Sequence, residues 1–370
     1  RNPAQFDMGR KGNLVAGLIA SGMIFAAVRF LTPSASLSHA MSATQSRCSR
    51  SVSRLRRATS LLKGVGVAAG VGLAGLPIGS ALSSRSLAAH AEASGGEKDI
   101  LVIGCGTLGE RVARAWKTSY PDAKVVGETK GDSRHTSFQQ HGITPRLADS
   151  KEALSGEEKF PYVVFSAPPS ASSDYVGAVK RAVDLWDKNG MIVFTSSGGS
   201  YLEEDGGVVV EDSPTKDPAS SPRVKMLLDS ENEIVKAGGC VVRLAGLYTL
   251  QRGAHSYWLQ RGQVSGSPEG LINLIHYDDA ADLVVAALKA GSASKGQVFL
   301  GVDDRPISRQ EICEAAMRHP SYEAKFQMPT FTGMTGSLGK RYDNTMTRQT
   351  LGWIPKYPSF DSFIDESRSK

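Results

Sequence analysis

Cysteine is scarce in this 370-residue chain, and its few cysteines do not form a recognisable framework. They are Cys48, Cys105, Cys240 and Cys313, and no two of them make a Cys-x-x-Cys pair. Such wide spacing indicates neither a zinc site nor a set of disulfides. We therefore expect no metal centre. Cys105 lies in a glycine-rich loop, and we interpret it as a small loop residue in preference to a redox switch.

Acidic residues are almost missing from the first quarter of the chain. Residues 1–91 carry 11 Lys and Arg residues but a single acid, Asp7, which leaves 32 basic and 36 acidic residues for the rest. The net charge of +6 therefore belongs to this N-terminal extension. Because the remainder is slightly acidic, its composition predicts no nucleic-acid partner.

The N-terminal extension also lacks a long uninterrupted apolar run. Its two apolar stretches, residues 14–28 and 65–82, are too short or too glycine-rich for stable membrane spans. Between them lies a segment rich in Ser and Arg and free of acids, which is typical of organelle transit peptides. The residues Ala89-His90-Ala91 have the small-x-small form of a cleavage site.

This order of signals predicts a targeting presequence and linker over residues 1–98, disordered or removed in the mature protein. We expect the mature protein to have no stable membrane span. The pattern favours a plastid, either the stroma or the thylakoid lumen, and the alternative is a mitochondrion. A start at Met41 stays open as a simpler explanation.

From residue 99 the chain alternates between continuous apolar runs and helical patterns. The strongest apolar runs lie at residues 99–105, 123–129, 162–167, 191–197 and 240–248. Continuous runs are typical of strands buried on both faces, and their alternation with helices indicates parallel pairing. We predict an α/β fold over residues 99–370, a doubly wound parallel sheet of the Rossmann type. A small C-terminal substrate lobe is expected at roughly 245–370.

A glycine-rich loop follows the first apolar run. Gly104, Gly106 and Gly109 fit the pattern G-x-G-x-x-G between a strand and an amphipathic helix, which is the context of a dinucleotide-binding loop. We expect Gly104 to allow a tight turn, Gly106 to let the backbone approach a pyrophosphate, and Gly109 to allow close packing of helix on strand. The helix N-terminus then offers free N–H groups to the phosphates.

The end of the second apolar run bears on the choice of cofactor. An acid there binds the ribose hydroxyl of NAD, whereas a basic residue favours the 2′-phosphate of NADP. Glu128 could serve NAD, while Lys130 and Arg134 could serve the phosphate. We favour NADP and keep NAD as the alternative.

Ligands in such sheets lie at the carboxyl ends of the strands, so the segment after the third strong run should line the same site. The predicted cofactor-binding residues are therefore Gly104, Cys105, Gly106, Thr107, Leu108, Gly109, Lys130, Ser166, Ala167, Pro168 and Ser196.

Further segments follow the glycine loop in a particular order: FTSSGGSY at 194–201, VVRLAGLY at 241–248, LIHYDDAADLVVAAL at 274–288, GVDDRPISRQEICEA at 301–315, and a tail at 339–360 ending in LGWIPKYPSF. Together they resemble the short-chain dehydrogenase/reductase superfamily, specifically its extended and atypical branch of NAD-dependent epimerase/dehydratase-like proteins. The resemblance covers residues 99–370. The loop departs from the commoner G-x-x-G-x-x-G of that family, since Ile103 stands at the first glycine.

The resemblance implies a Ser or Thr and a Tyr-x-x-x-Lys pair for proton transfer, and this pair is missing. Ser197 falls at the Ser/Thr position, but Arg223 and Leu227 stand where the Tyr and Lys would be. An arginine does not give up its proton, so it is a poor general acid. We take Ser197 and Tyr201 as catalytic candidates and Arg243 as a candidate anchor for a substrate anion.

Two functions from different classes are compatible with this pattern. The first is an NADP-binding oxidoreductase or epimerase-like enzyme acting on a small carbonyl or nucleotide-sugar-like substrate. The second is an inactive NADP(H)-sensing or structural subunit that keeps the cofactor loop without the Tyr/Lys pair. The expected partner is a small-molecule substrate, and the expected assembly is a monomer or homodimer.

Overall fold

The computed structural model describes residues 96–333 and 336–368. The predicted presequence lies outside these residues apart from residues 96–98. In the described part of the chain, no helix has the length and apolar character needed to cross a membrane.

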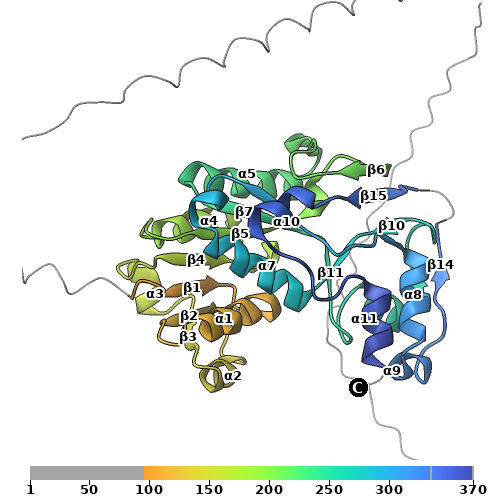
Figure 1. The fold of residues 1–370 in the computed structure, drawn as a ribbon, viewed down its shortest axis with the longest axis horizontal. Helices are drawn as coiled ribbons and strands as arrows, with labels where there is room; N and C mark the ends of the chain where they lie inside the picture. Colours follow the sequence, from red (N-terminus) through yellow and green to blue (C-terminus); the bar gives the residue numbers. More distant parts are fainter. Residues whose placement is uncertain (1–95, 334–335, 369–370) are drawn as a thin grey trace, which may run out of the picture. The chain divides into compact units, whose positions relative to one another are not determined.

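A seven-stranded parallel sheet forms the centre of this body, in the order β12-β7-β5-β4-β1-β2-β3 (Figure 1). All of its neighbours pair in parallel. The predicted α/β fold with a doubly wound parallel sheet is therefore confirmed. The strands are β1 (Ile100–Ile103), β2 (Val125–Thr129), β3 (Thr144–Leu147), β4 (Tyr162–Phe165), β5 (Ile192–Ser197), β7 (Cys240–Leu244) and β12 (Val298–Gly301).

Some of the helices cover the two faces of the sheet and others belong to the C-terminal lobe. The helices are α1 (Thr107–Ser119), α2 (His135–Gln140), α3 (Lys151–Ser155), α4 (Tyr175–Asp184), α5 (Pro222–Ala237), α6 (Ala254–Arg261), α7 (Tyr277–Lys289), α8 (Arg309–Met317), α9 (Pro320–Glu323), α10 (Thr345–Leu351) and α11 (Phe360–Ser367). Short 3₁₀ turns lie at Pro169–Ala171, Gly198–Ser200, Pro218–Ser220 and Gly291–Ser294.

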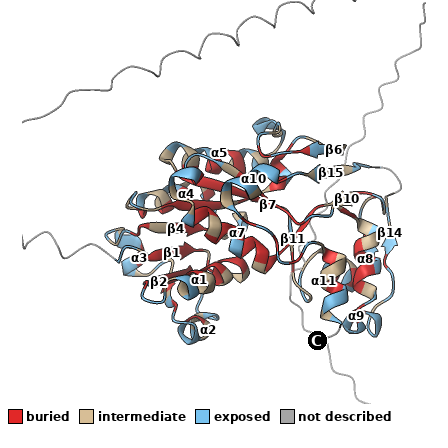
Figure 2. Cartoon of the chain, in the orientation of Figure 1, coloured by how far each residue is buried: buried red, intermediate tan, exposed pale blue. Residues whose placement is uncertain are grey.

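The side chains of each strand alternate between two apolar layers. Ile100 and Val102 of β1 pack with α1 and α7 on one face, and Leu101 and Ile103 pack with α4 and α5 on the other. Successive side chains of a strand point to opposite faces, so a continuous apolar run is needed when both faces are covered. Figure 2 shows the result, with strands buried along their length and helices exposed on their outer sides.

Small two-stranded sheets extend the body beyond the central sheet. β15 (Gly339–Tyr342) pairs in parallel with β6 (Asp205–Val209), and β11 (Leu274–His276) pairs in parallel with β8 (Gly246–Tyr248). The remaining pairs are β14 (Thr330–Phe331) with β9 (Gln263–Val264), and β13 (Ile307–Ser308) with β10 (Leu271–Ile272).

The C-terminal lobe has its own apolar core, formed by α6, α8, α9 and α11 around Tyr248. It does not take up the whole of residues 245–370, which differs from our expectation. β12 joins the edge of the central sheet and α7 packs on one of its faces. The chain therefore returns from the lobe to the sheet before it enters the lobe again.

Asp303 is a buried carboxyl group that follows β12. It is 3% exposed, its Oδ1 accepts a hydrogen bond from the Arg305 amide (3.2 Å), and its Oδ2 has no partner in the described structure. Burial raises the pKa of Asp303 to about 8, against about 3.9 for an unfolded aspartate. The folded state thus keeps a proton that the unfolded state releases.

This shift predicts a stability that falls as the pH rises from about 4 to about 8. Asp303→Asn, which mimics the protonated form, should reduce the loss of unfolding free energy between pH 5 and pH 8. Urea denaturation of the full chain at the two pH values measures it, with the exposed Asp122→Asn as the matched control. An unchanged pH dependence in Asp303→Asn would contradict the assignment.

Candidate functional site

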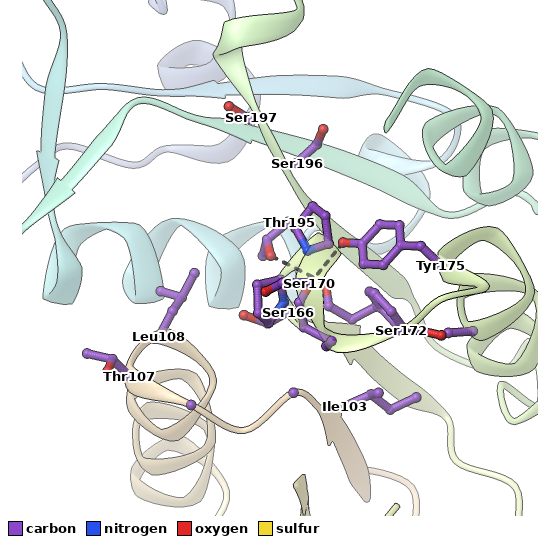
Figure 3. A pocket seen from close by; sticks show the side chains of 18 of the residues that line it. Ile103, Thr107, Leu108, Ser166, Ser170, Ser172, Tyr175, Thr195, Ser196 and Ser197 are labelled. Atoms are coloured by element: carbon purple, nitrogen blue, oxygen red, sulfur yellow. Dashed lines mark hydrogen bonds between the residues drawn. The ribbon is translucent and has the colours of Figure 1, made fainter. Parts of the chain in front are cut away.

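A cavity of about 870 Å³ opens at the carboxyl ends of the central strands. In Figure 3, Thr107 and Leu108 at the start of α1 stand on one side and Ser196 and Ser197 at the end of β5 on the other, with Ser166 between them in this view. Predicted site residues that line it are Gly104, Gly106, Thr107, Leu108, Lys130, Ser166, Ala167, Pro168, Ser196 and Ser197. The fold thus brings together segments from β1, β2, β4 and β5. What these residues bind stays a prediction.

The glycine loop has the backbone conformation that its sequence indicates. Gly104 has φ +78°, and a Cβ there would lie 2.3 Å from the Ala167 amide nitrogen. A Cβ on Gly109 would lie 2.8 Å from the Gly104 oxygen and 3.0 Å from Cγ1 of Val102. Both positions therefore require glycine, the first for the turn and the contact with the next loop, the second for packing α1 on β1.

Gly106 differs from the other two glycines because space is open beside it. The atom nearest to a Cβ at this position would be the Gly104 oxygen, at 3.9 Å. Gly106 is the N-cap of α1, and no described side chain caps this helix end. The fold thus leaves room for a side chain at position 106, yet the sequence has a glycine there. The open space and the uncapped helix N-terminus fit a pyrophosphate group.

Cys105 belongs to this loop, yet its side chain is directed into the protein. It is fully buried, and its sulfur lies 2.9 Å from the position that a Cβ on Gly127 would occupy. Burial raises the pKa of the Cys105 thiol to about 12, so it stays protonated. The buried side chain agrees with a small loop residue, and Cys105 is not among the residues that line the cavity.

Glu128 stands at the end of β2, where an acid could bind a ribose hydroxyl, but its carboxylate is already engaged. It is 1% exposed. Arg146 of β3 donates to it from Nε (3.0 Å), and Arg181 of α4 donates from both terminal nitrogens (2.7 and 2.9 Å). Its backbone oxygen accepts the amides of Gly104 and Cys105. Glu128 therefore connects β3, α4 and the glycine loop at this end of the cavity.

The charges that line the cavity are mostly positive. Glu128 is the only acidic residue in the lining as far as the chain is described, whereas the basic residues are Lys130, Arg134, Arg181, Arg223 and Arg252. Arg134 pairs with Glu110 of α1 (2.9 Å). Lys130 has no carboxylate partner among the residues described. A cavity of this charge favours an anionic ligand.

The polar groups at the end of β5 differ in what they still offer. Ser196 donates its hydroxyl proton to Glu231 (2.5 Å). The Ser197 oxygen accepts only the Gly199 amide (3.2 Å), so its own O–H is available to a ligand. Ser197 is thus placed to donate a hydrogen bond into the cavity, as its predicted role requires.

Arg223 and Leu227 line the cavity from the first turns of α5. These are the positions that would carry the Tyr and the Lys if the resemblance held there. The nearby Lys225 is exposed, pairs with Asp229 (2.7 Å) and lies outside the lining. No lysine therefore replaces the missing pair at this part of α5.

Tyr201 and Arg243 are not placed as we expected. Tyr201 is fully buried, and its hydroxyl donates a hydrogen bond to the backbone oxygen of Glu211 (3.0 Å). Burial raises the pKa of the Tyr201 hydroxyl. Arg243 is paired with Glu231 (2.6 Å) and stacks 4.6 Å over the Tyr201 ring. Neither residue lines the cavity. Both side chains make structural contacts inside the protein and do not face the cavity. Their positions therefore argue against catalysis by Tyr201 and against an anion anchor at Arg243.

Sequence reasoning missed many residues of the lining, and three of them carry a charge or a hydroxyl group that bears on ligand binding. Arg181 comes from α4, Arg252 from the turn after β8, and Tyr277 from the start of α7. Arg252 donates from Nε to the Tyr277 hydroxyl (3.0 Å). An arginine in a helix or turn has no local pattern that separates it from a solvated surface charge. The only available signal was the position of Arg252 shortly after the end of β8.

Comparisons with known proteins give a structural answer only. No protein-family model and no curated protein matches the sequence. Among solved structures, dTDP-glucose 4,6-dehydratase from Bacillus anthracis, solved with NAD, has 15% identity and a TM-score of 0.61 over 73% of this chain and 95% of its own. UDP-glucose 4-epimerase from Thermotoga maritima, solved with UDP-glucose, has 18% identity and 0.57 over 73% and 97%.

A conserved protein of unknown function from Silicibacter pomeroyi has 20% identity and a TM-score of 0.59, over 73% of this chain and 98% of its own. The chain has the fold of the epimerase and dehydratase enzymes. This agrees with the resemblance found in the sequence. At these identities the likeness concerns the fold alone.

The different surroundings of the glycines give a matched pair of variants. Gly106→Ala should keep the free energy of unfolding and lower the affinity for a nicotinamide dinucleotide, since its methyl group enters the open space. Gly104→Ala should lower the unfolding free energy by about 2–4 kcal/mol, through strain and overlap with Ala167. Urea denaturation and calorimetric titration of the full chain measure both. Equal dinucleotide affinity in Gly106→Ala and wild type would contradict the assignment of the loop.

Proposed function

We propose that the body of this chain is an NADP-dependent oxidoreductase or epimerase-like enzyme, acting on a small carbonyl or nucleotide-sugar-like substrate. The observation that carries the proposal is the engaged state of Glu128. Arg146 and Arg181 neutralise the acid that would favour NAD, while Lys130 and Arg134 line the same end of the cavity. The solved structures with this fold include enzymes in complex with NAD.

The glycine loop would hold the pyrophosphate, with the amides at the start of α1 and the open side of Gly106 facing it. Lys130 and Arg134 would hold the 2′-phosphate, because charge-assisted hydrogen bonds to phosphate are about twice as strong as neutral ones. Ala167 and Pro168 would form the wall beside the ribose. When bound, the cofactor supplies the hydride-transfer chemistry.

Proton handling would fall to few groups of this chain. Ser197 has an available O–H at the end of β5, as described above. Tyr175 also lines the cavity, but its hydroxyl donates to the Ala167 oxygen (2.8 Å), and burial raises its pKa. We therefore assign Ser197 to the hydrogen bond with a reacting substrate oxygen, with solvent as the source of the proton.

We also propose that the N-terminal extension directs the protein to a plastid. The charge split and the transit-like composition of residues 1–91 support this proposal. Sequencing the N-terminus of the mature protein tests it, and a first residue well before Ala91 would rule out the late cleavage site.

The cofactor proposal predicts a selective loss of affinity. Lys130→Ala should weaken NADP binding about tenfold or more and leave NAD binding unchanged, since a hydrogen bond to a charged group contributes about 1.5–3 kcal/mol. Calorimetric titration of the full chain with each dinucleotide measures it. Lys180→Ala, which removes an exposed lysine of α4 outside the lining, is the control. Equal losses for NADP and NAD would contradict selection through the 2′-phosphate.

The enzymatic part of the proposal predicts turnover. Loss of NADPH absorbance should follow addition of a carbonyl substrate that is reduced, whereas a nucleotide sugar that is epimerised should give a new product by chromatography without net loss of NADPH. Ser197→Ala should slow either reaction by about a hundredfold or more. The full chain is assayed against a panel of both substrate types. Tight NADPH binding without turnover across the panel would favour the inactive NADP(H)-sensing subunit instead.

A further inference from the structure

Two arginines line the cavity at its β7 end, far along the sheet from Lys130 and Arg134. Arg223 lies in the first turn of α5, and Arg252 lies in the turn after β8. Both residues are exposed, and neither has a carboxylate partner in the part of the chain that the structure describes. Arginine keeps its positive charge in proteins, so this end of the cavity carries two uncompensated cations.

The two arginines approach from opposite faces of the sheet. α5 packs with α4 on one face, whereas Arg252 donates to Tyr277, the first residue of α7, which packs on the other face. They therefore flank the carboxyl end of β7 from both sides. The lining residues at the end of β7 and in the segment that follows it are apolar: Leu244, Ala245 and Leu247.

Tyr277 fixes the direction of the Arg252 side chain. Its hydroxyl accepts the Nε–H of Arg252 at 3.0 Å, which leaves the terminal nitrogens of the guanidinium available to other acceptors. The Tyr277 ring is itself held, since it is 7% exposed and the Arg111 guanidinium lies 5.5 Å from its centre. Arg252 is thus oriented by the protein in the manner of a binding group, which an ordinary surface arginine is not.

We infer that Arg223 and Arg252 form an anion-binding subsite for the substrate, which would carry a carboxylate or a phosphate group. This inference rests on the proposed function, in which the cofactor takes the glycine-loop end of the cavity. Guanidinium groups bind carboxylate and phosphate through two parallel hydrogen bonds. An anion between two like charges also offsets their mutual repulsion. Tyr277 is a positioning residue for Arg252.

The test uses the full chain saturated with NADP⁺ and titrated by calorimetry with sodium phosphate or with sodium malonate, at constant ionic strength. Wild type should bind at least one of the two anions saturably. Arg223→Gln and Arg252→Gln should each weaken that binding about tenfold. Tyr277→Phe should weaken it by a smaller factor, since it removes only the hydroxyl that orients Arg252.

Lys225→Gln is the matched control, because it removes an exposed cation from the same helix outside the cavity, and anion binding should not change. NADP⁺ affinity is measured for every variant and should stay within about twofold of wild type. A preference for phosphate or for malonate identifies the anionic group, and either preference supports the subsite.

Three results would overturn the inference. Anion binding could be absent in wild type, or unchanged in both arginine variants. Alternatively, Arg252→Gln could weaken NADP⁺ and leave anion binding intact, which would assign Arg252 to the phosphates of the cofactor. Failure of the proposed function gives a different pattern, in which wild type does not bind NADP⁺ at all, and the anion titrations without cofactor then still compare the arginine variants with wild type.

Discussion

The ion pairs of the buried Glu128 carboxylate with Arg146 and Arg181 are the interaction on which this end of the cavity depends. The Glu128 backbone oxygen fixes the start of the glycine loop, and its side chain holds Arg146 of β3 and Arg181 of α4. A buried charge is costly unless it is paired and fully hydrogen-bonded, so these three side chains must keep their places together. Glu128 thereby links the glycine loop, β3 and α4 at this end of the cavity.

The same ion cluster determines the charge that a ligand meets. Because Glu128 is neutralised from within and Arg134 pairs with Glu110, the uncancelled positive charge at this end of the lining is that of Lys130. Arg223 and Arg252 place further positive charge at the other end of the cavity, where no acid lines it among the residues described. A ligand with anionic groups at both ends therefore suits this cavity better than a neutral one. A dinucleotide with an acidic substrate beside it has this form.

Local patterns predicted the fold and the glycine loop, because a strand, a turn and a helix N-terminus are encoded by neighbouring residues. The open space beside Gly106 could be anticipated for this reason. Tyr201 and Arg243 could not be placed, since their burial depends on Glu211 and Glu231, which only the folded chain brings beside them. The same holds for Arg181 and Arg252, whose partners lie 53 and 25 residues away. Contacts between distant segments, and not element type, limit what a single sequence reveals about this site.

A crystal structure of the full chain with NADP⁺ tests the central claim most directly. Our account predicts the pyrophosphate beside Gly106 at the start of α1, and the 2′-phosphate within hydrogen-bonding distance of Lys130 or Arg134. The Glu128 carboxylate should keep its contacts with Arg146 and Arg181. A nucleotide bound outside this cavity would contradict the account, and so would a 2′-phosphate turned away from both basic residues.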